Sequence, residues 1–172
     1  MSFKKAILAV FFVGCIAGCG FSPVYWKEKD EPSILEKTAQ IKIEPIPEES
    51  GRILTQALKD RFNPRYEEAD KNYTLSVKIK EEINKDQGIL GDKTSTRATF
   101  NLKAFYILKQ QEKELLSSTA SAISSYNILT DPYSTITTEQ AVRERLLKTL
   151  ANDISLQITS YFKNEEKEES EK

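Results

Sequence analysis

The sequence contains no histidine and only two cysteines, Cys15 and Cys19, and both shortages narrow what the protein can do. Without histidine there is no Ser-His-Asp or Cys-His catalysis and no imidazole ligand for a metal ion. Carboxylate-only and Ser-Lys chemistry remain open in principle, but nothing in the sequence isolates such a group. We therefore expect a protein that is not an enzyme and holds no metal or other dissociable cofactor.

The chain also lacks an excess of charge of either sign. It has 25 Lys and Arg residues against 26 Asp and Glu residues, so no strongly basic field is present to attract nucleic acid. Its uninterrupted apolar run, Ala6 to Ile16, is shorter than the roughly 20 residues that a membrane-spanning helix needs. Following Lys4 and Lys5, this run is typical of the hydrophobic part of a signal peptide.

The residues after this run, Ile16-Ala17-Gly18-Cys19, match the bacterial lipobox. We expect cleavage before Cys19, giving a signal peptide over 1–18, with diacylglycerol on the Cys19 thiol and an acyl chain on its amine. Several acyl chains together anchor a protein stably in a membrane. Gly20 permits export to the outer membrane. The alternative is an ordinary signal peptide in which Cys19 is incidental; a redox pair with Cys15 is disfavoured because Cys15 would be removed.

The rest of the chain predicts one α+β domain over 39–162, between an extended lipid-anchored arm (19–38) and a disordered charged tail (163–172). Two-residue alternation predicts a short edge strand at 39–46 and three longer strands at 71–83, 94–108 and 114–129. Helical periodicity predicts one helix at 52–62 and a second that begins at the Thr137–Gln140 capping-box pattern. The order β-α-β-β-β-α predicts a two-layer sandwich, a four-stranded and mostly antiparallel sheet with two helices on one face.

In such a sandwich the second face of the sheet stays uncovered and polar. It either faces water, as many antiparallel sheets do, or docks against a partner that is also polar. The candidate contact residues on this face are Lys78, Lys80, Thr99, Asn101 and Lys103.

Several short motifs resemble one family. Cys19-Gly20-Phe21-Ser22-Pro23-Val24-Tyr25 resembles the start of the mature lipopolysaccharide-assembly lipoprotein LptE, above all in its alphaproteobacterial form. Ser125-Tyr126-Asn127, Pro132-Tyr133-Ser134 and the Ala141-x-Arg143-x-Arg145 pattern are similar to a later block of that family. The resemblance covers about 19–162. It implies an outer-membrane, periplasm-facing lipoprotein that plugs the LptD barrel, helps it to assemble and takes part in lipopolysaccharide transport to the outer leaflet.

The family resemblance also implies direct contact with lipopolysaccharide through basic residues. The connection between the second and third strands, 83–97, offers basic residues around an apolar tip: Lys85, Ile89, Leu90, Lys93 and Arg97. The alternative is a plain hairpin whose Ile-Leu pair folds back onto the sheet. Two further candidates are Arg143, which snorkels or pairs with a carboxylate in the alternative reading, and Tyr25-Trp26, suited to a membrane interface or to packing on the domain.

Two other functions compete with this one. An accessory lipoprotein of an ABC-type lipid transporter can combine a lipobox with a similar small sandwich, although the Cys19–Tyr25 motif argues against it. An anchored hydrolase would need two acids close together, one with a raised pKa. The acids available for it are Glu81, Glu82, Asp86 and Asp92, which the sequence places on turns and solvent faces.

Overall fold

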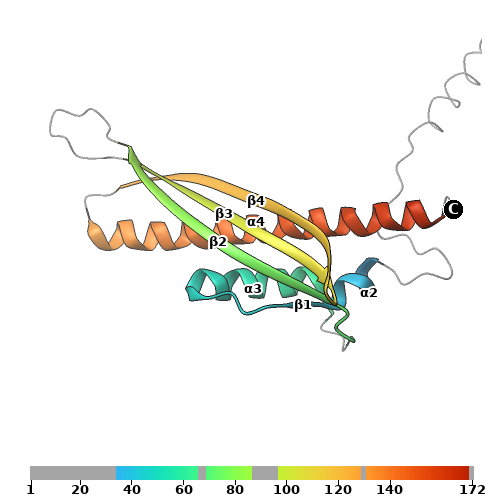
Figure 1. Ribbon diagram of the computed structural model, residues 1–172. Helices are drawn as coiled ribbons and strands as arrows, with labels where there is room; N and C mark the ends of the chain where they lie inside the picture. Colours follow the sequence, from blue (N-terminus) through green and yellow to red (C-terminus); the bar gives the residue numbers. More distant parts are fainter. Residues whose placement is uncertain (1–33, 66–68, 87–96, 129–130, 171–172) are drawn as a thin grey trace, which may run out of the picture. The chain divides into compact units, whose positions relative to one another are not determined.

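The computed structural model describes residues 34–65, 69–86, 97–128 and 131–170 (Figure 1). The predicted signal peptide, Cys19 and most of the predicted arm lie outside these residues. The described residues belong to one compact unit, and its elements are α2 (Ile34–Ala39), β1 (Ile41–Ile43), α3 (Glu48–Phe62), β2 (Tyr73–Asp86), β3 (Arg97–Gln110), β4 (Lys113–Asn127) and α4 (Pro132–Ser170).

The four strands form one sheet in the order β1-β2-β3-β4. β1 pairs parallel with β2, while β2–β3 and β3–β4 are antiparallel. This confirms the predicted α+β fold with a mostly antiparallel four-stranded sheet. β1 is short and lies at the edge, because Pro45 and Pro47 follow it and proline has no amide to donate to a ladder.

The hydrophobic core lies between one face of the sheet and the helices α3 and α4 (Figure 1). Alternate side chains of β3 point into it, and all of them are buried: Ala98, Phe100, Leu102, Ala104, Tyr106 and Leu108. α4 contributes an apolar stripe at helical spacing that includes Leu147, Leu150, Ile154, Ile158 and Phe162. Among the described elements, no helix covers the opposite face of β2, β3 and β4.

The start of α4 differs from the prediction. The helix begins at Pro132, so the Thr137–Gln140 capping-box pattern lies inside it and the prediction of a start there was wrong. Asp131 caps the helix instead: its Oδ2 accepts hydrogen bonds from the Ser134 amide at 2.9 Å and the Ser134 hydroxyl at 2.6 Å. Pro132 is well suited to the first helical position, where its missing amide costs nothing.

Two segments that were predicted to be irregular are helical. α4 continues to Ser170, so the prediction that the charged tail is disordered from Lys163 was wrong. The end of the predicted extended arm forms α2. The two segments are joined by an ion pair in which Lys37 Nζ lies 3.0 Å from Glu166 Oε1, with both side chains largely buried. This contact gives the last turns of α4 a tertiary partner that their composition does not reveal.

Candidate functional site: the uncovered face of the sheet

The uncovered face of the sheet is built from alternate residues of β2, β3 and β4, which the strand register aligns in rows. One row runs Asn84, Thr99, Ser125 and the next runs Glu82, Asn101, Ile123. The following two rows are Lys80, Lys103, Ser121 and Lys78, Phe105, Thr119. In the first row the Thr99 and Ser125 hydroxyl oxygens lie 3.2 Å apart, within hydrogen-bond distance. This surface is called the open face below.

The structure brings all five sequence-predicted barrel-contact residues together on the open face. Lys78, Lys80 and Lys103 are exposed, and Thr99 and Asn101 are half-buried. The alternation of side chains along each strand was enough to predict this placement. Contact with a partner stays a prediction.

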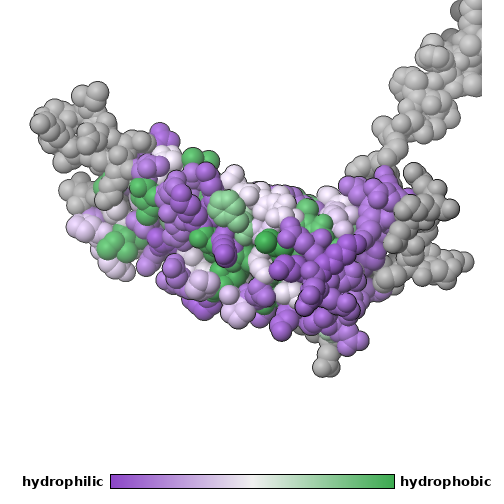
Figure 2. Space-filling model, in the orientation of Figure 1, coloured by the Kyte–Doolittle hydropathy of each residue, from purple (hydrophilic) through white to green (hydrophobic). Residues whose placement is uncertain are grey.

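The open face is less polar than predicted. Phe105 is 49% exposed and Ile123 is 67% exposed, and both lie among the polar rows. Sequence reasoning missed Phe105, although it shares the parity of Asn101 and Lys103 along β3. Over the part of the surface seen in Figure 2, hydrophobic residues likewise interrupt a largely hydrophilic exterior. A partner of the open face would have to offer apolar contacts as well as hydrogen bonds.

The charge of the open face is mainly positive. Lys80 and Lys103 stand directly opposite each other, an unfavourable arrangement for like charges. Glu82 reduces this repulsion, because Glu82 Oε1 lies 2.7 Å from Lys80 Nζ. The hydrogen bond from Lys80 holds the pKa of Glu82 below its usual value, and the same bond raises the pKa of Lys80. Among the described residues no carboxylate pairs with Lys78, so the face keeps a surplus of cations.

A groove of about 1030 Å³ lies beside these lysines. The connection from β1 to α3, Glu44–Glu48, lines one side of it, and the Ser76 hydroxyl donates a hydrogen bond to Glu44 across it. The groove is also lined by Lys78, Lys80, Phe105, Ile107 and Thr119. Its lining thus combines an aromatic ring, hydroxyl groups and ammonium groups.

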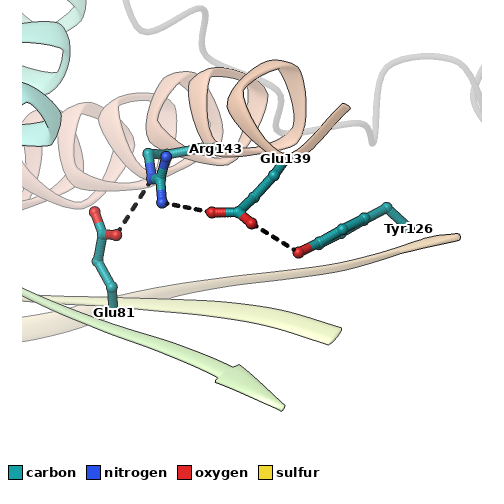
Figure 3. A network of polar contacts seen from close by, with 4 residues as sticks. All are labelled: Glu81, Tyr126, Glu139 and Arg143. Carbon is teal, nitrogen blue, oxygen red and sulfur yellow. Dashed lines mark hydrogen bonds and ion pairs between the residues drawn. The ribbon is translucent and has the colours of Figure 1, made fainter. Parts of the chain in front are cut away.

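A second polar cluster lies on the covered face, between β2, β4 and the first half of α4 (Figure 3). Arg143 Nε lies 3.3 Å from Glu81 Oε2, and Arg143 Nη2 lies 2.9 Å from Glu139 Oε1. The Tyr126 hydroxyl donates to Glu139 Oε2 at 3.1 Å. Burial, followed by the hydrogen bond to Glu139, raises the pKa of Tyr126. The guanidinium also lies 5.0 Å from the ring centroid of Phe100, a cation–π contact.

This cluster corrects one expectation and confirms another. Glu81, predicted on a turn or a solvent face, is three-quarters buried and ion-paired. Arg143 points to the covered side and pairs with carboxylates, as expected. Glu81 Oε1 is buried without a hydrogen-bond partner. Two carboxylates share one guanidinium here, and the described residues contain no group of three or more side chains that could hold a metal ion. The arrangement clamps α4 to the sheet.

The candidate lipopolysaccharide contacts are only partly described. Ile89, Leu90 and Lys93 lie outside the described residues. Lys85 belongs to the end of β2, and Arg97 begins β3 as an exposed residue. β2 continues to Asp86, past its predicted end at residue 83, so the connection to β3, predicted at 83–97, shortens to 87–96. In the part of the chain that the structure describes, no helix is long and apolar enough to cross a membrane.

Comparison with known proteins places the fold among lipoproteins. In sequence comparisons no family model and no curated protein matches the chain. Several solved structures, however, match its fold. A protein of Caulobacter crescentus CB15 described as a lipoprotein has a TM-score of 0.61 at 17% identity, covering 78% of this chain and 98% of its own.

Two further structures show the same fold. The minor lipoprotein of Acinetobacter baumannii has a TM-score of 0.58 at 20% identity, over 70% of this chain and 90% of its own. The rare lipoprotein B of Shewanella oneidensis has a TM-score of 0.57 at 11% identity, over 73% of this chain and 96% of its own. This chain therefore has the α+β sandwich fold of these bacterial lipoproteins.

Proposed function

We propose that the protein is a non-enzymatic outer-membrane lipoprotein, anchored by lipid on Cys19, that plugs an LptD-like β-barrel. In this role it assists barrel assembly and takes part in lipopolysaccharide transport to the outer leaflet. The main support for this proposal is the open face, which is long, cationic and mainly polar and is covered by no described helix. The lumen of a large outer-membrane barrel is polar and would accept such a surface.

Three independent features support this role. The Ile16–Cys19 lipobox provides the anchor. The Cys19–Tyr25 motif and the later motifs resemble the LptE family. The fold is shared with three bacterial lipoproteins. The surplus of lysine on the open face suits an acidic stretch of lumen wall, because complementary charge guides docking and fixes register.

Site-specific photocrosslinking in intact outer membranes tests the proposal. A photoreactive residue replaces Thr99 or Lys103 on the open face, and in a matched control it replaces Lys148, which is exposed on α4. We expect one large adduct with a barrel protein from the open face and little from Lys148. An adduct with components of an ATP-driven transporter would favour the accessory-lipoprotein role instead. No adduct from either open-face position in a correctly lipidated, folded protein would refute docking through this face.

The anchor needs its own test. Replacing Cys19 with alanine should abolish incorporation of radiolabelled palmitate and release the protein from the membrane fraction. Cys15→Ala is the matched control and should leave lipidation intact. Unchanged palmitate incorporation in Cys19→Ala would show that Cys19 is incidental.

A further inference from the structure

Among the described residues, β2 has a long edge, most of which pairs with no other strand. β1 pairs only from Ile41 to Ile43, opposite Tyr73 to Leu75, and β2 then continues to Asp86. The Tyr73 amide donates to Gln40 O, and Leu75 O accepts from the Glu44 amide, so these residues direct their backbone groups toward β1. Backbone groups alternate in direction along a strand. The amides and carbonyls on the unpaired part of this edge therefore belong to Val77, Ile79, Glu81, Ile83 and Lys85.

The β1–α3 connection, the described segment next to this edge, does not pair with it. After Ile43 the β1–α3 connection contains Pro45 and Pro47, which cannot donate to a ladder. Ile46 is buried, and a Cβ at Gly51 would overlap its carbonyl group, so the connection packs tightly against the first turn of α3. The groove of about 1030 Å³ described above is lined by this connection and by β2, and it extends over the open face to Phe105 on β3 and Thr119 on β4. The connection therefore leaves space along the edge rather than filling it.

The side chains along the edge define what could pair there. On the open face they include Lys78, Lys80 and Glu82. Glu82 pairs with Lys80, and Lys103 lies opposite Lys80 on β3, so cations outnumber carboxylates there. On the covered face Ile79 is half-buried and Ile83 is 38% exposed. An added strand would present alternate side chains to these two faces. Acidic residues would meet the lysines, and apolar residues would extend the contact made by the two isoleucines.

We propose that the free edge of β2, from Ser76 to Asp86, binds an extended segment of a partner protein in which acidic and apolar residues alternate. Main-chain hydrogen bonds would provide affinity, and the alternating side chains would provide specificity. A second copy of the chain could place Lys80 of one copy against Glu82 of the other, and edge protection that depends on protein concentration distinguishes this occupant. Binding at this edge does not require the proposed barrel docking and can be measured without a barrel.

Peptide binding to the full chain, purified in detergent, tests this inference. The probe is a fluorescent, end-blocked peptide of seven residues alternating glutamate and valine, and the matched probe alternates lysine and valine. Fluorescence anisotropy at low salt should show at least tenfold tighter binding of the glutamate peptide. Amide exchange by NMR should show new protection at Val77, Ile79, Glu81 and Ile83. Equal affinity for the two peptides, or no binding of either, would overturn the inference.

Two sets of variants separate edge pairing from nonspecific attraction. Ile83→Pro removes an amide from the free edge and leaves the hydrogen bonds between β2 and β3 intact. It should weaken binding of the glutamate peptide about tenfold. By the same alternation the Ser121 amide points out of the β4 edge, so Ser121→Pro is the matched control and should bind normally. Lys78→Glu combined with Lys80→Glu should reverse the preference between the peptides, a result that misfolding cannot produce. Protection of the β4 edge, or edge protection that rises with protein concentration alone, would refute the inference and indicate another edge or a second copy.

Discussion

Arg143 on α4 lies 3.3 Å from Glu81 on β2, and this ion pair ties the first half of the long helix to the edge side of the sheet. The same guanidinium holds Glu139 at 2.9 Å and packs over Phe100. Three separate interactions thus depend on one side chain that is only 24% exposed. Since Glu81 and Arg143 lie 62 positions apart in the sequence, their pairing specifies how α4 lies on the sheet as well as stabilising it.

Replacing Arg143 with alanine should therefore be costly. The change leaves two carboxylates facing each other without their cation, and we expect the free energy of unfolding to fall by about 2 kcal/mol. Urea unfolding followed by circular dichroism measures it. Arg145→Ala is the matched control, since Arg145 is exposed and its guanidinium donates a hydrogen bond to the Ser124 hydroxyl; it should cost under about 0.5 kcal/mol.

A double-mutant cycle then isolates the ion pair. In Glu81→Gln the side chain at position 81 carries no negative charge to be neutralised. Adding Arg143→Ala should therefore lower the free energy of unfolding by less than it does in the wild type. We expect a coupling energy on the order of 1 kcal/mol between the two positions. A coupling near zero would show that Arg143 acts through Phe100 and Glu139 alone.

Gln157 forms a second link between α4 and the sheet. Its Oε1 accepts hydrogen bonds at 2.8 Å from the hydroxyls of Tyr106 and Ser118, on β3 and β4. Gln157→Leu removes the acceptor that both hydroxyls share and should lower the free energy of unfolding by about 1–3 kcal/mol. Combining it with Tyr106→Phe and Ser118→Ala removes those hydroxyls and should restore most of the loss. Gln140→Leu, at an exposed position on the same helix, is the control; equal effects of both leucine variants in thermal unfolding would contradict this account.

Much of the fold could be predicted from local pattern, because side-chain alternation and helical periodicity are properties of neighbouring residues. They correctly predicted the strands, the helix-covered face and the five residues of the open face. The pairing of Glu81 with Arg143 could not be predicted this way, since periodicity shows which side a residue faces but not what lies opposite. The helical tail was missed for the same reason: composition argues for disorder, while Lys37 on α2 stabilises Glu166 from outside the segment. The start of α4 was missed because two capping signals compete within ten residues.

The Lys37–Glu166 ion pair predicts a response to high pH. Burial alone would lower the pKa of Lys37, but its hydrogen bond and charge interaction with Glu166 outweigh this and raise the pKa. A raised lysine pKa means that the pair stabilises the fold fully below the unfolded value of about 10.4 and loses its effect as the pH rises through the folded value. The last turns of α4 should therefore fray in that alkaline range.

Glu166→Gln should produce the same fraying at neutral pH. We expect amide exchange in residues 163–170 to become several-fold faster, with little change around Ile154. Glu168→Gln is the control, because Glu168 is exposed. Unchanged exchange in Glu166→Gln would mean that the tail helix does not depend on α2.

The cap of α4 provides a test in acid, and it compares the observed helix start with the predicted one. Hydrogen bonds from the Ser134 hydroxyl and then from its amide lower the pKa of Asp131. A lowered carboxyl pKa contributes stability above the unfolded value of about 3.9, and that contribution is lost as the pH falls through the folded value. The Ser134 amide should thus lose protection from exchange below about pH 4.

At neutral pH Asp131→Ala should cause the same loss, whereas Asp131→Asn should retain much of the protection, because asparagine also caps helices. Thr137 bonds the carbonyl of Tyr133 at 2.9 Å within the helix, so Thr137→Ala should leave the first turn unchanged. If Thr137→Ala opens the first turn and Asp131→Ala does not, the helix starts at the capping-box pattern after all.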